Sequence, residues 1–164
     1  MLKRNFLKAP GRIRKQREVV MNRQQIAVKQ FEAGFNCAQS VLLAFALELG
    51  LPEELASKLA QAFGGGMALM GDACGAVIGG LMVIGLKYGK VKPEDASARE
   101  KTYSLAREFF RSFRTRHGSL LCRELLGVDL SQEGGYERAA AQGLFKTVCP
   151  DLISSSIRIL EDLI

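Results

Sequence analysis

The sequence predicts an all-α fold: a compact bundle of about six to seven helices around a central glycine-rich apolar helix at about residues 73–88. No segment alternates apolar and polar residues in the way that half-buried strands do. Apolar residues recur instead at steps of three and four, which is helical spacing. The 164 residues are 48% hydrophobic and 24% charged, with four prolines and no tryptophan. This composition is typical of one globular domain that is large enough to bury a core.

The first part of the chain is expected to hold three helices. From about residue 17, apolar residues recur at helical spacing until Gly34 interrupts the pattern. Asn36 is a suitable N-cap for a second helix, which stops at Gly50. Pro52 opens a third helix with acidic residues in its first turn. The residues expected on the inward face of this third helix are Leu55, Leu59 and Phe63.

The stretch from Phe63 to Gly89 is the poorest in charge and the richest in glycine. Asp72 is a suitable N-cap for a helix from Ala73 to Tyr88, which Gly89 ends. The residues whose backbones we expect to approach a cofactor or a neighbouring element are Gly64, Gly65, Gly66, Gly75 and Gly79. The spacing of the last two lets another helix pack closely. The glycine run is not a P-loop, because no G-K-[ST] follows it.

The same stretch raises the question of a membrane span. A 20-residue window from Met67 to Leu86 contains one charged residue, Asp72, and a span needs about 20 apolar residues. The acid and the glycines weaken that interpretation, and the predicted helix is shorter than a span. We therefore expect a central helix that is buried by its neighbours, and not an integral membrane protein.

The second half of the chain is expected to hold one long helix and several shorter ones. The long helix covers about residues 93–116, with acidic residues at its start and arginines at its end, the order that its dipole favours. Ser119 then starts a short helix that carries Cys122. After a polar loop, a helical piece is expected from Tyr136 to Phe145, and the last helix from Pro150 to Ile164.

The four cysteines occupy the same kind of position, since each lies in or beside the first turn of a different predicted helix. They are Cys37, Cys74, Cys122 and Cys149. The unpaired N–H groups and the positive dipole end at a helix start favour a thiolate. If the four helix starts converge, the thiols form a cluster. We expect Cys74 to be its most thiolate-like member.

Thiolates serve several kinds of chemistry, and the residues leave these open. Disulfide exchange, iron–sulfur ligation and zinc binding all use them. The four cysteines are therefore candidate catalytic residues and, if an iron–sulfur cluster or zinc is bound, its candidate ligands. They could equally pack as small hydrophobic residues. The sequence contains neither C-x-x-C nor C-x-x-C-H, so no c-type haem is expected.

The net charge of +6 comes from the N-terminal end. Residues 1–20 carry seven basic groups and one acid, and the remaining residues carry equal numbers of each. We therefore predict a basic arm at residues 1–16 before a single helical domain at 17–164, and a nucleic-acid partner is not favoured. The arm lacks the apolar segment of a secretory signal. Widely spaced cysteines without such a signal favour a cytoplasmic protein.

Two further sets of basic residues are candidates for the thiol site. His117 is the only histidine, and a cation at the end of the long helix would favour the dipole. Its alternative role is a proton donor or a ligand near Cys122. Arg107, Arg111 and Arg114 are expected on a solvated face. Their alternative role is to line the thiol cluster, where they would stabilise thiolates or an anionic substrate.

These cysteines resemble the signature of a family of redox-active proteins named C-GCAxxG-C-C. That signature is a lone cysteine, a C-G-A-x-x-G box and two further lone cysteines. Here the motifs are NCAQSVL, CGAVIGG, GSLLCRELLGVDL and TVCP, which contain Cys37, Cys74, Cys122 and Cys149 in that order. The resemblance covers about Phe31 to Cys149. It implies redox activity through the four cysteines and a gene located near transporter genes, without implying a substrate.

The leading interpretation is a redox-active protein that uses its cysteine cluster for thiol–disulfide exchange or for iron–sulfur electron transfer. One alternative is a non-catalytic carrier or sensor that binds zinc or another soft metal. Another is a helical interaction module in which the cysteines pack and the glycine-rich helix forms a dimer contact. The partners predicted are a redox protein or a transporter-associated protein, and a second copy of the chain in a homodimer.

Overall fold

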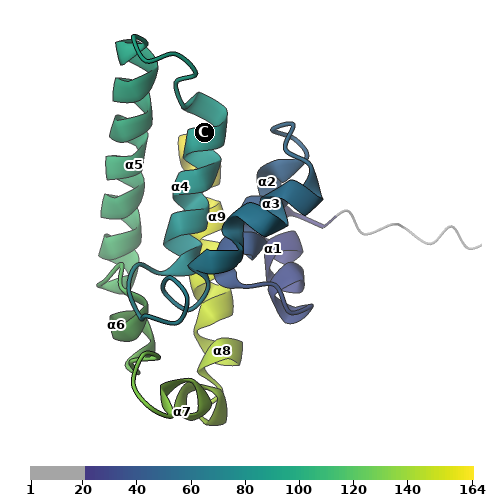
Figure 1. Cartoon of the computed structure of the whole chain (residues 1–164), viewed down its shortest axis with the longest axis vertical. Helices are drawn as coiled ribbons and strands as arrows, with labels where there is room; N and C mark the ends of the chain where they lie inside the picture. Colours follow the sequence, from purple (N-terminus) through teal and green to yellow (C-terminus); the bar gives the residue numbers. More distant parts are fainter. Residues whose placement is uncertain (1–20) are drawn as a thin grey trace, which may run out of the picture.

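The computed structural model describes residues 21–164 and confirms the all-α fold (Figure 1). Within that range the chain forms nine α-helices, one 3-10 turn and no strand beyond a single isolated bridge. The helices are α1 (Arg23–Glu32), α2 (Cys37–Ala46), α3 (Glu53–Ala60), η1 (Gln61–Phe63), α4 (Gly75–Tyr88), α5 (Ala96–His117), α6 (Cys122–Leu126), α7 (Gly135–Ala141), α8 (Leu144–Thr147) and α9 (Cys149–Leu163). The single helical piece predicted from Tyr136 to Phe145 is two short helices, α7 and α8.

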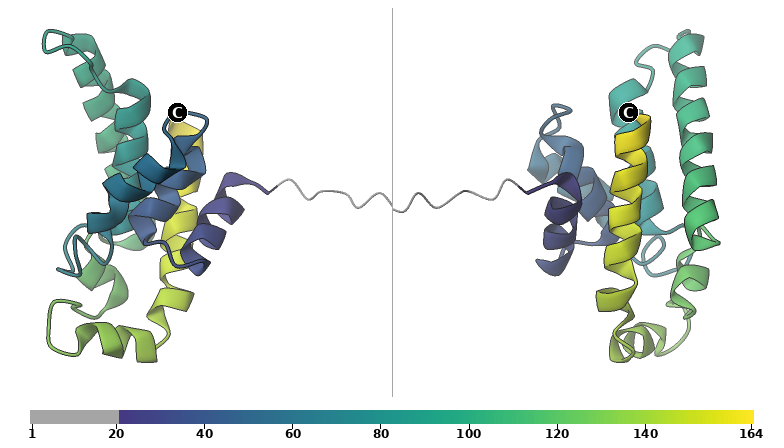
Figure 2. Two further views of the ribbon diagram at one scale, coloured as in Figure 1. Left: turned by 45° about the vertical axis from the view of Figure 1, so that its right-hand side comes forward. Right: turned by 180° about the vertical axis from the view of Figure 1, so that it is seen from behind.

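Helix α4 is central, as the sequence predicts. It contacts α2, α5 and α9. Figures 1 and 2 show α5 on one side of α4 and α9, α1–α3 on the other side, and α6–α8 at one end. The buried core is formed mainly by α2, α4, α5 and α9, with Phe109, Phe113, Ile84 and Ile153 among its largest side chains.

The glycines of α4 let its neighbours approach closely. A Cβ atom on Gly79 would lie 2.8 Å from the Ala38 carbonyl oxygen of α2 and from the Val41 side chain. On Gly80 it would lie 2.4 Å from the ring of Phe109 on α5. The G-x-x-x-G contact is therefore made inside the chain, which leaves this face unavailable as the dimer contact that one alternative required. No helix in the described part of the chain is both long and apolar enough to cross a membrane.

Helix α3 presents the opposite face from the one predicted. Leu55 and Leu59 are 46% and 54% exposed, whereas Ala56 and Ala60 are fully buried. The prediction was wrong because α3 packs closely on α2 through small residues. The buried side chain of Gln39 also occupies this contact, where its amide nitrogen donates to the Ser57 carbonyl oxygen at 2.9 Å.

Two predicted boundaries also shift. The long helix begins at Ala96 and not near residue 93, because the side chain of Asp95 accepts a hydrogen bond from the Ala98 amide and caps it there. Helix α1 is described from Arg23, with Asn22 as its N-cap. The predicted basic arm at residues 1–16, and the proposed start of the domain at residue 17, lie outside the described residues.

Candidate functional site

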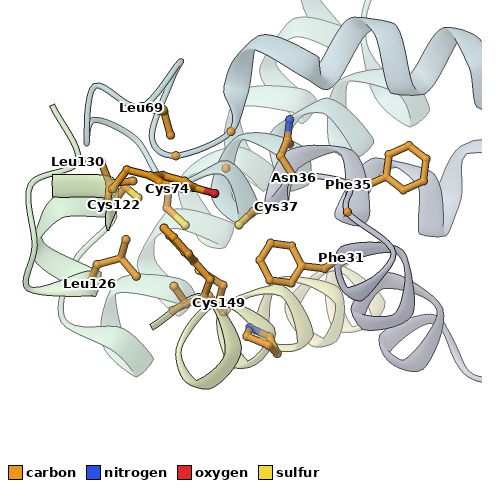
Figure 3. A pocket seen from close by; sticks show the side chains of 18 of the residues that line it. Phe31, Phe35, Asn36, Cys37, Leu69, Cys74, Cys122, Leu126, Leu130 and Cys149 are labelled. Carbon is orange, nitrogen blue, oxygen red and sulfur yellow. The ribbon is translucent and has the colours of Figure 1, made fainter. Parts of the chain in front are cut away.

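All four cysteines line one pocket, which has a volume of about 820 Å³ (Figure 3). Cys37, Cys122 and Cys149 are the first residues of α2, α6 and α9, and Cys74 is the N-cap of α4. The structure therefore brings the four helix starts together. None of the four cysteines forms a disulfide here.

Cys37 is positioned by the N-cap of α2. The Asn36 side chain accepts from the amides of Ala38 and Gln39 at 2.9 and 3.0 Å, and the Gln39 side chain accepts from the Asn36 amide at 2.8 Å. The Asn36 side-chain nitrogen also donates to the Gln61 carbonyl oxygen at 2.9 Å. The sequence indicated only a good cap at Asn36; the capping box and the bond to Gln61 tie the first turn of α2 to the start of η1.

Cys74 and Cys122 are positioned together by an isolated antiparallel bridge between Ala73 and Leu121. The Cys74 amide donates to the Leu120 carbonyl oxygen at 2.8 Å, and the Cys122 amide donates to the Asp72 carbonyl oxygen at 2.7 Å. Asp72 is therefore not the predicted N-cap of α4. Its backbone is used in this bridge, and its carboxylate accepts from the Arg123 guanidinium at 3.1 Å.

A left-handed loop borders the thiol pocket. Gly65 and Gly66 have positive φ angles, and so do three consecutive residues that are not glycine, Met67, Ala68 and Leu69, at 65°, 53° and 66°. This conformation costs such residues about 1–2 kcal/mol each. Hydrogen bonds hold the loop, including one of 2.8 Å from the Ala68 amide to the Ala62 carbonyl oxygen. Sequence reasoning noticed the glycines but missed the residues that follow, because nothing in their side chains indicates a positive φ.

The five glycines named as close-approach positions divide into two groups. Gly64, Gly65 and Gly75 line the pocket. Gly66 and Gly79 do not line it, but all five allow close packing: a Cβ atom on Gly66 would lie 2.6 Å from the Cβ atom of Cys122, and one on Gly75 would lie 2.9 Å from the Phe63 carbonyl oxygen. Close packing accounts for Gly66 and Gly79, and a cofactor role for the five glycines stays a prediction.

Burial decides the acidity of Cys74 and Cys122. Cys74 is 2% exposed, and burial raises the pKa of its thiol to about 11 although the amides of Ala76 and Val77 act to lower it. Burial likewise raises the pKa of the Cys122 thiol to about 12, with smaller contributions from Cys74 and Cys149. The expectation that Cys74 is the most thiolate-like cysteine was therefore wrong. The effect of the helix start is present, but the loss of hydration is larger.

Cys37 and Cys149 shift each other's pKa values in opposite directions. Interaction with the Cys37 thiol stabilises the ionised Cys149 sulfur and lowers the pKa of Cys149 despite its burial. The pKa of Cys37 is raised well above its ordinary value, first by this interaction and then by burial. Cys149 is thus the thiol of this pair that ionises first.

The rest of the pocket wall is mainly apolar. Aromatic side chains from α1, from the loop that follows it and from the C-terminal part of the chain contribute to it, namely Phe31, Phe35, Tyr136 and Phe145. The rings of Tyr136 and Phe145 pack with their centroids 5.1 Å apart. The charged residues on the wall are Glu32 and Lys146. A bound substrate would therefore meet thiols on an apolar surface.

The basic side chains considered as site candidates lie elsewhere. Arg107, Arg111 and Arg114 line a separate hollow of about 430 Å³ on α5, so they do not line the thiol pocket. His117 packs on Phe113 with ring centroids 4.7 Å apart, and its Nε2 atom has no hydrogen-bond partner. Burial lowers the pKa of His117, which favours the neutral ring over the predicted cation.

A metal centre finds limited support in this arrangement. Among residues 21–164, no group of three or more His, Cys, Asp or Glu side chains is placed to hold a metal ion. The four thiols line one pocket without converging on a single point of coordination.

Comparison with known proteins places the chain in a family. Searches of curated proteins and of solved structures found no match. A family model described as "Putative redox-active protein (C_GCAxxG_C_C)" matches residues 35–163, a span that includes all four cysteines of the pocket. The chain therefore belongs to the C_GCAxxG_C_C family.

Proposed function

We propose that this chain is a thiol–disulfide redox protein whose Cys37 and Cys149 cycle between a dithiol and a disulfide. The observation that carries this proposal is that both cysteines line one pocket and interact closely enough for each to shift the pKa of the other. A redox dithiol needs two sulfurs within reach of each other and one thiol that ionises readily. The mutual pKa shifts support the first requirement, and the lowered pKa of Cys149 supports the second.

The exchange step assigns a different role to each cysteine. The Cys149 thiolate attacks one sulfur of a substrate disulfide, forms a mixed disulfide and releases the first substrate thiolate, which takes up a proton. Cys37 then loses its proton and attacks the Cys149 sulfur, which releases the second substrate thiolate. The substrate gains two electrons and two protons, and the chain is left with a Cys37–Cys149 disulfide.

The pocket supplies the binding surface for this step. Its apolar wall and aromatic rings would hold a substrate disulfide against the paired thiols, with Leu69 of the left-handed loop at its border. As residues, Cys37 is half-buried and Cys149 is buried. A redox or transporter-associated partner, a homodimer and a cytoplasmic location remain predictions, and thiol–disulfide exchange in a reducing compartment accords with them.

Trapping the mixed disulfide tests the proposal. Reduced protein that carries Cys37→Ser together with Cys74→Ala is incubated with glutathione disulfide, and peptide mass spectrometry locates the bound glutathione. We expect glutathione on Cys149, because the serine hydroxyl still donates to that sulfur but cannot resolve the mixed disulfide. The wild type should instead form the Cys37–Cys149 disulfide. Equal reaction of wild type and Cys149→Ala with glutathione disulfide would contradict the proposal.

An iron–sulfur cluster or zinc on the four cysteines is the second candidate function, and the shared pocket is the observation that favours it. The cysteines of such a site would act as thiolate ligands and would resist alkylation until a chelator removed the metal. Iron and zinc are measured in protein prepared without oxygen and without a metal-binding tag. One metal centre per chain would replace the dithiol proposal.

A further inference from the structure

We propose that Cys74 and Cys122 form a second dithiol, which exchanges with the Cys37–Cys149 pair inside the pocket so that the chain can store two disulfides. This inference rests on the proposed function, since it needs a first pair that becomes oxidised. It assigns a redox role to two cysteines whose burial alone would suggest simple packing.

The bridge between Ala73 and Leu121 gives the first reason for pairing these cysteines. The hydrogen bonds of Cys74 to Leu120 and of Cys122 to Asp72, at 2.8 and 2.7 Å, flank the bridge on both sides. In such an antiparallel pair, residues 74 and 122 lie on the same face as diagonal neighbours. Diagonal Cα atoms are typically about 7–8 Å apart, and a disulfide needs less than about 7 Å. Closure therefore requires a movement on the order of 1 Å.

The packing allows such a movement on the Cys122 side. Cys122 begins α6, which has only five residues and ends at the left-handed Gly127. Cys122 belongs to a small core cluster that includes Cys149, whereas Cys74 lies in the main core. A small shift of α6 would therefore leave the main core in place. Gly66 has no side chain, so the backbone of the left-handed loop lies directly against Cys122.

Exposure gives the reason for a relay. Cys74, Cys122 and Cys149 are 2%, 7% and 5% exposed, and Cys37 is half-buried. The first pair therefore contains the only one of the four cysteine residues that is not buried, whereas both members of the second pair are buried. Figure 3 shows the side chains of Cys74, Cys122 and Cys37 directed into the same pocket. The second pair can therefore receive a disulfide from the first pair without a substrate touching it.

The internal exchange balances without another reactant. Cys74 loses its proton and attacks the Cys149 sulfur of the Cys37–Cys149 disulfide, and Cys37 leaves as a thiolate that takes up a proton. Cys122 then loses its proton and attacks the Cys74 sulfur, and Cys149 leaves. The result is a Cys74–Cys122 disulfide and a Cys37–Cys149 dithiol. Two electrons and two protons have moved from the second pair to the first.

The acidities of the thiols support a direction for the exchange. A dithiol that is stabilised by an easily formed thiolate is a stronger oxidant as a disulfide. The lowered pKa of Cys149 stabilises the reduced first pair, whereas burial raises the pKa values of Cys74 and Cys122 to about 11 and about 12. At equilibrium, the Cys74–Cys122 disulfide is therefore expected to predominate over the Cys37–Cys149 disulfide.

A time course on the full wild-type chain tests the relay. The fully reduced protein receives one molar equivalent of diamide, samples are quenched with acid, and free thiols are alkylated before peptide mass spectrometry. We expect the Cys37–Cys149 disulfide first and then its replacement by Cys74–Cys122, with one disulfide per chain throughout. In the variant with Cys37→Ala and Cys149→Ala, oxidation of Cys74 and Cys122 should slow by about tenfold or more.

The outcomes separate the relay from the proposed function. If Cys74 and Cys122 stay alkylatable after two equivalents have fully oxidised Cys37 and Cys149, the relay is wrong and the first pair stands. Undiminished oxidation of Cys74 and Cys122 in the double variant would also overturn the relay, because it would show direct oxidation. If no Cys37–Cys149 disulfide forms at any time, the proposed function itself fails.

Discussion

Cys37 and Cys149 interact closely enough for each to shift the pKa of the other, although their helices α2 and α9 lie near opposite ends of the described chain. The interaction arises because α1, α2 and α9 pack on one another, and because both cysteines occupy the first position of their helices. In the proposed function, Cys149 is the attacking thiol of this pair and Cys37 is the resolving thiol. The predictions that follow test this pair and the scaffold around it.

Removing the hydrogen-bond donor should make Cys149 less acidic. In Cys37→Ala the lowering interaction is lost and burial remains, so the pKa of Cys149 should rise. We expect alkylation of Cys149 by iodoacetamide at pH 8 to slow by roughly tenfold, followed peptide by peptide. Cys122→Ala is the control and should leave the pH profile of Cys149 unchanged. Identical profiles in Cys37→Ala and wild type would show that the contact has no effect.

The stability of the fold should fall in alkaline solution. The pKa of Cys74 is raised from 9.0 to about 11 in the folded chain, so the folded state holds this proton more tightly than the unfolded state. Its contribution is complete below about pH 9 and is lost as the pH rises toward 11. The loss is on the order of 3 kcal/mol. Denaturant unfolding should show a steeper decline for wild type than for Cys74→Ala, and parallel curves would refute this.

Two glycines of α4 should respond oppositely to alanine. In Gly79→Ala the new Cβ atom would lie 2.8 Å from the Ala38 carbonyl oxygen, so α2 has to move and the free energy of unfolding should fall by about 1–3 kcal/mol. Gly85 has nothing within 4 Å of that position. Gly85→Ala should therefore raise the free energy of unfolding by about 0.5–1 kcal/mol. Equal effects at the two sites, measured by urea unfolding, would contradict the packing described for α2 and α4.

Glycine should stabilise the left-handed loop. Ala68 has a φ of 53°, which costs about 1–2 kcal/mol for alanine and almost nothing for glycine. After the larger chain entropy of glycine is subtracted, Ala68→Gly should raise the free energy of unfolding by roughly 0.5–1 kcal/mol. Ala140→Gly on exposed α7 is the matched control and should lower it by a similar amount. A loss of stability in Ala68→Gly would mean that the loop is not strained.

The sequence predicted the fold class and the central helix because these depend on local patterns. Helical spacing and the glycine-rich stretch around Gly79 correctly indicated an all-α fold with α4 at its centre. The inward face of α3 was predicted wrongly, since Leu55 and Leu59 are exposed and α2 contacts the smaller Ala56 and Ala60. Which face is buried depends on how closely two helices approach, and hydrophobicity alone does not determine that distance.

The site shows the same division between local and long-range information. Placing each cysteine at a helix start was possible from caps such as Asn36. The acidity of the thiols was not, because burial of Cys74 outweighs the helix start and the partner of Cys149 comes from α2. Both effects depend on neighbours that are remote in the sequence. The bridge between Ala73 and Leu121 could not be foreseen for the same reason.

The most direct test of the account is to map the disulfide of the wild-type chain after brief oxidation and after subsequent reduction. Reduced protein is treated with glutathione disulfide for increasing times, quenched with acid, alkylated and analysed by peptide mass spectrometry. The account predicts that Cys37–Cys149 is the first disulfide to form and that dithiothreitol restores both thiols completely. A first disulfide that joins any other two cysteines, or no disulfide at all, would contradict it.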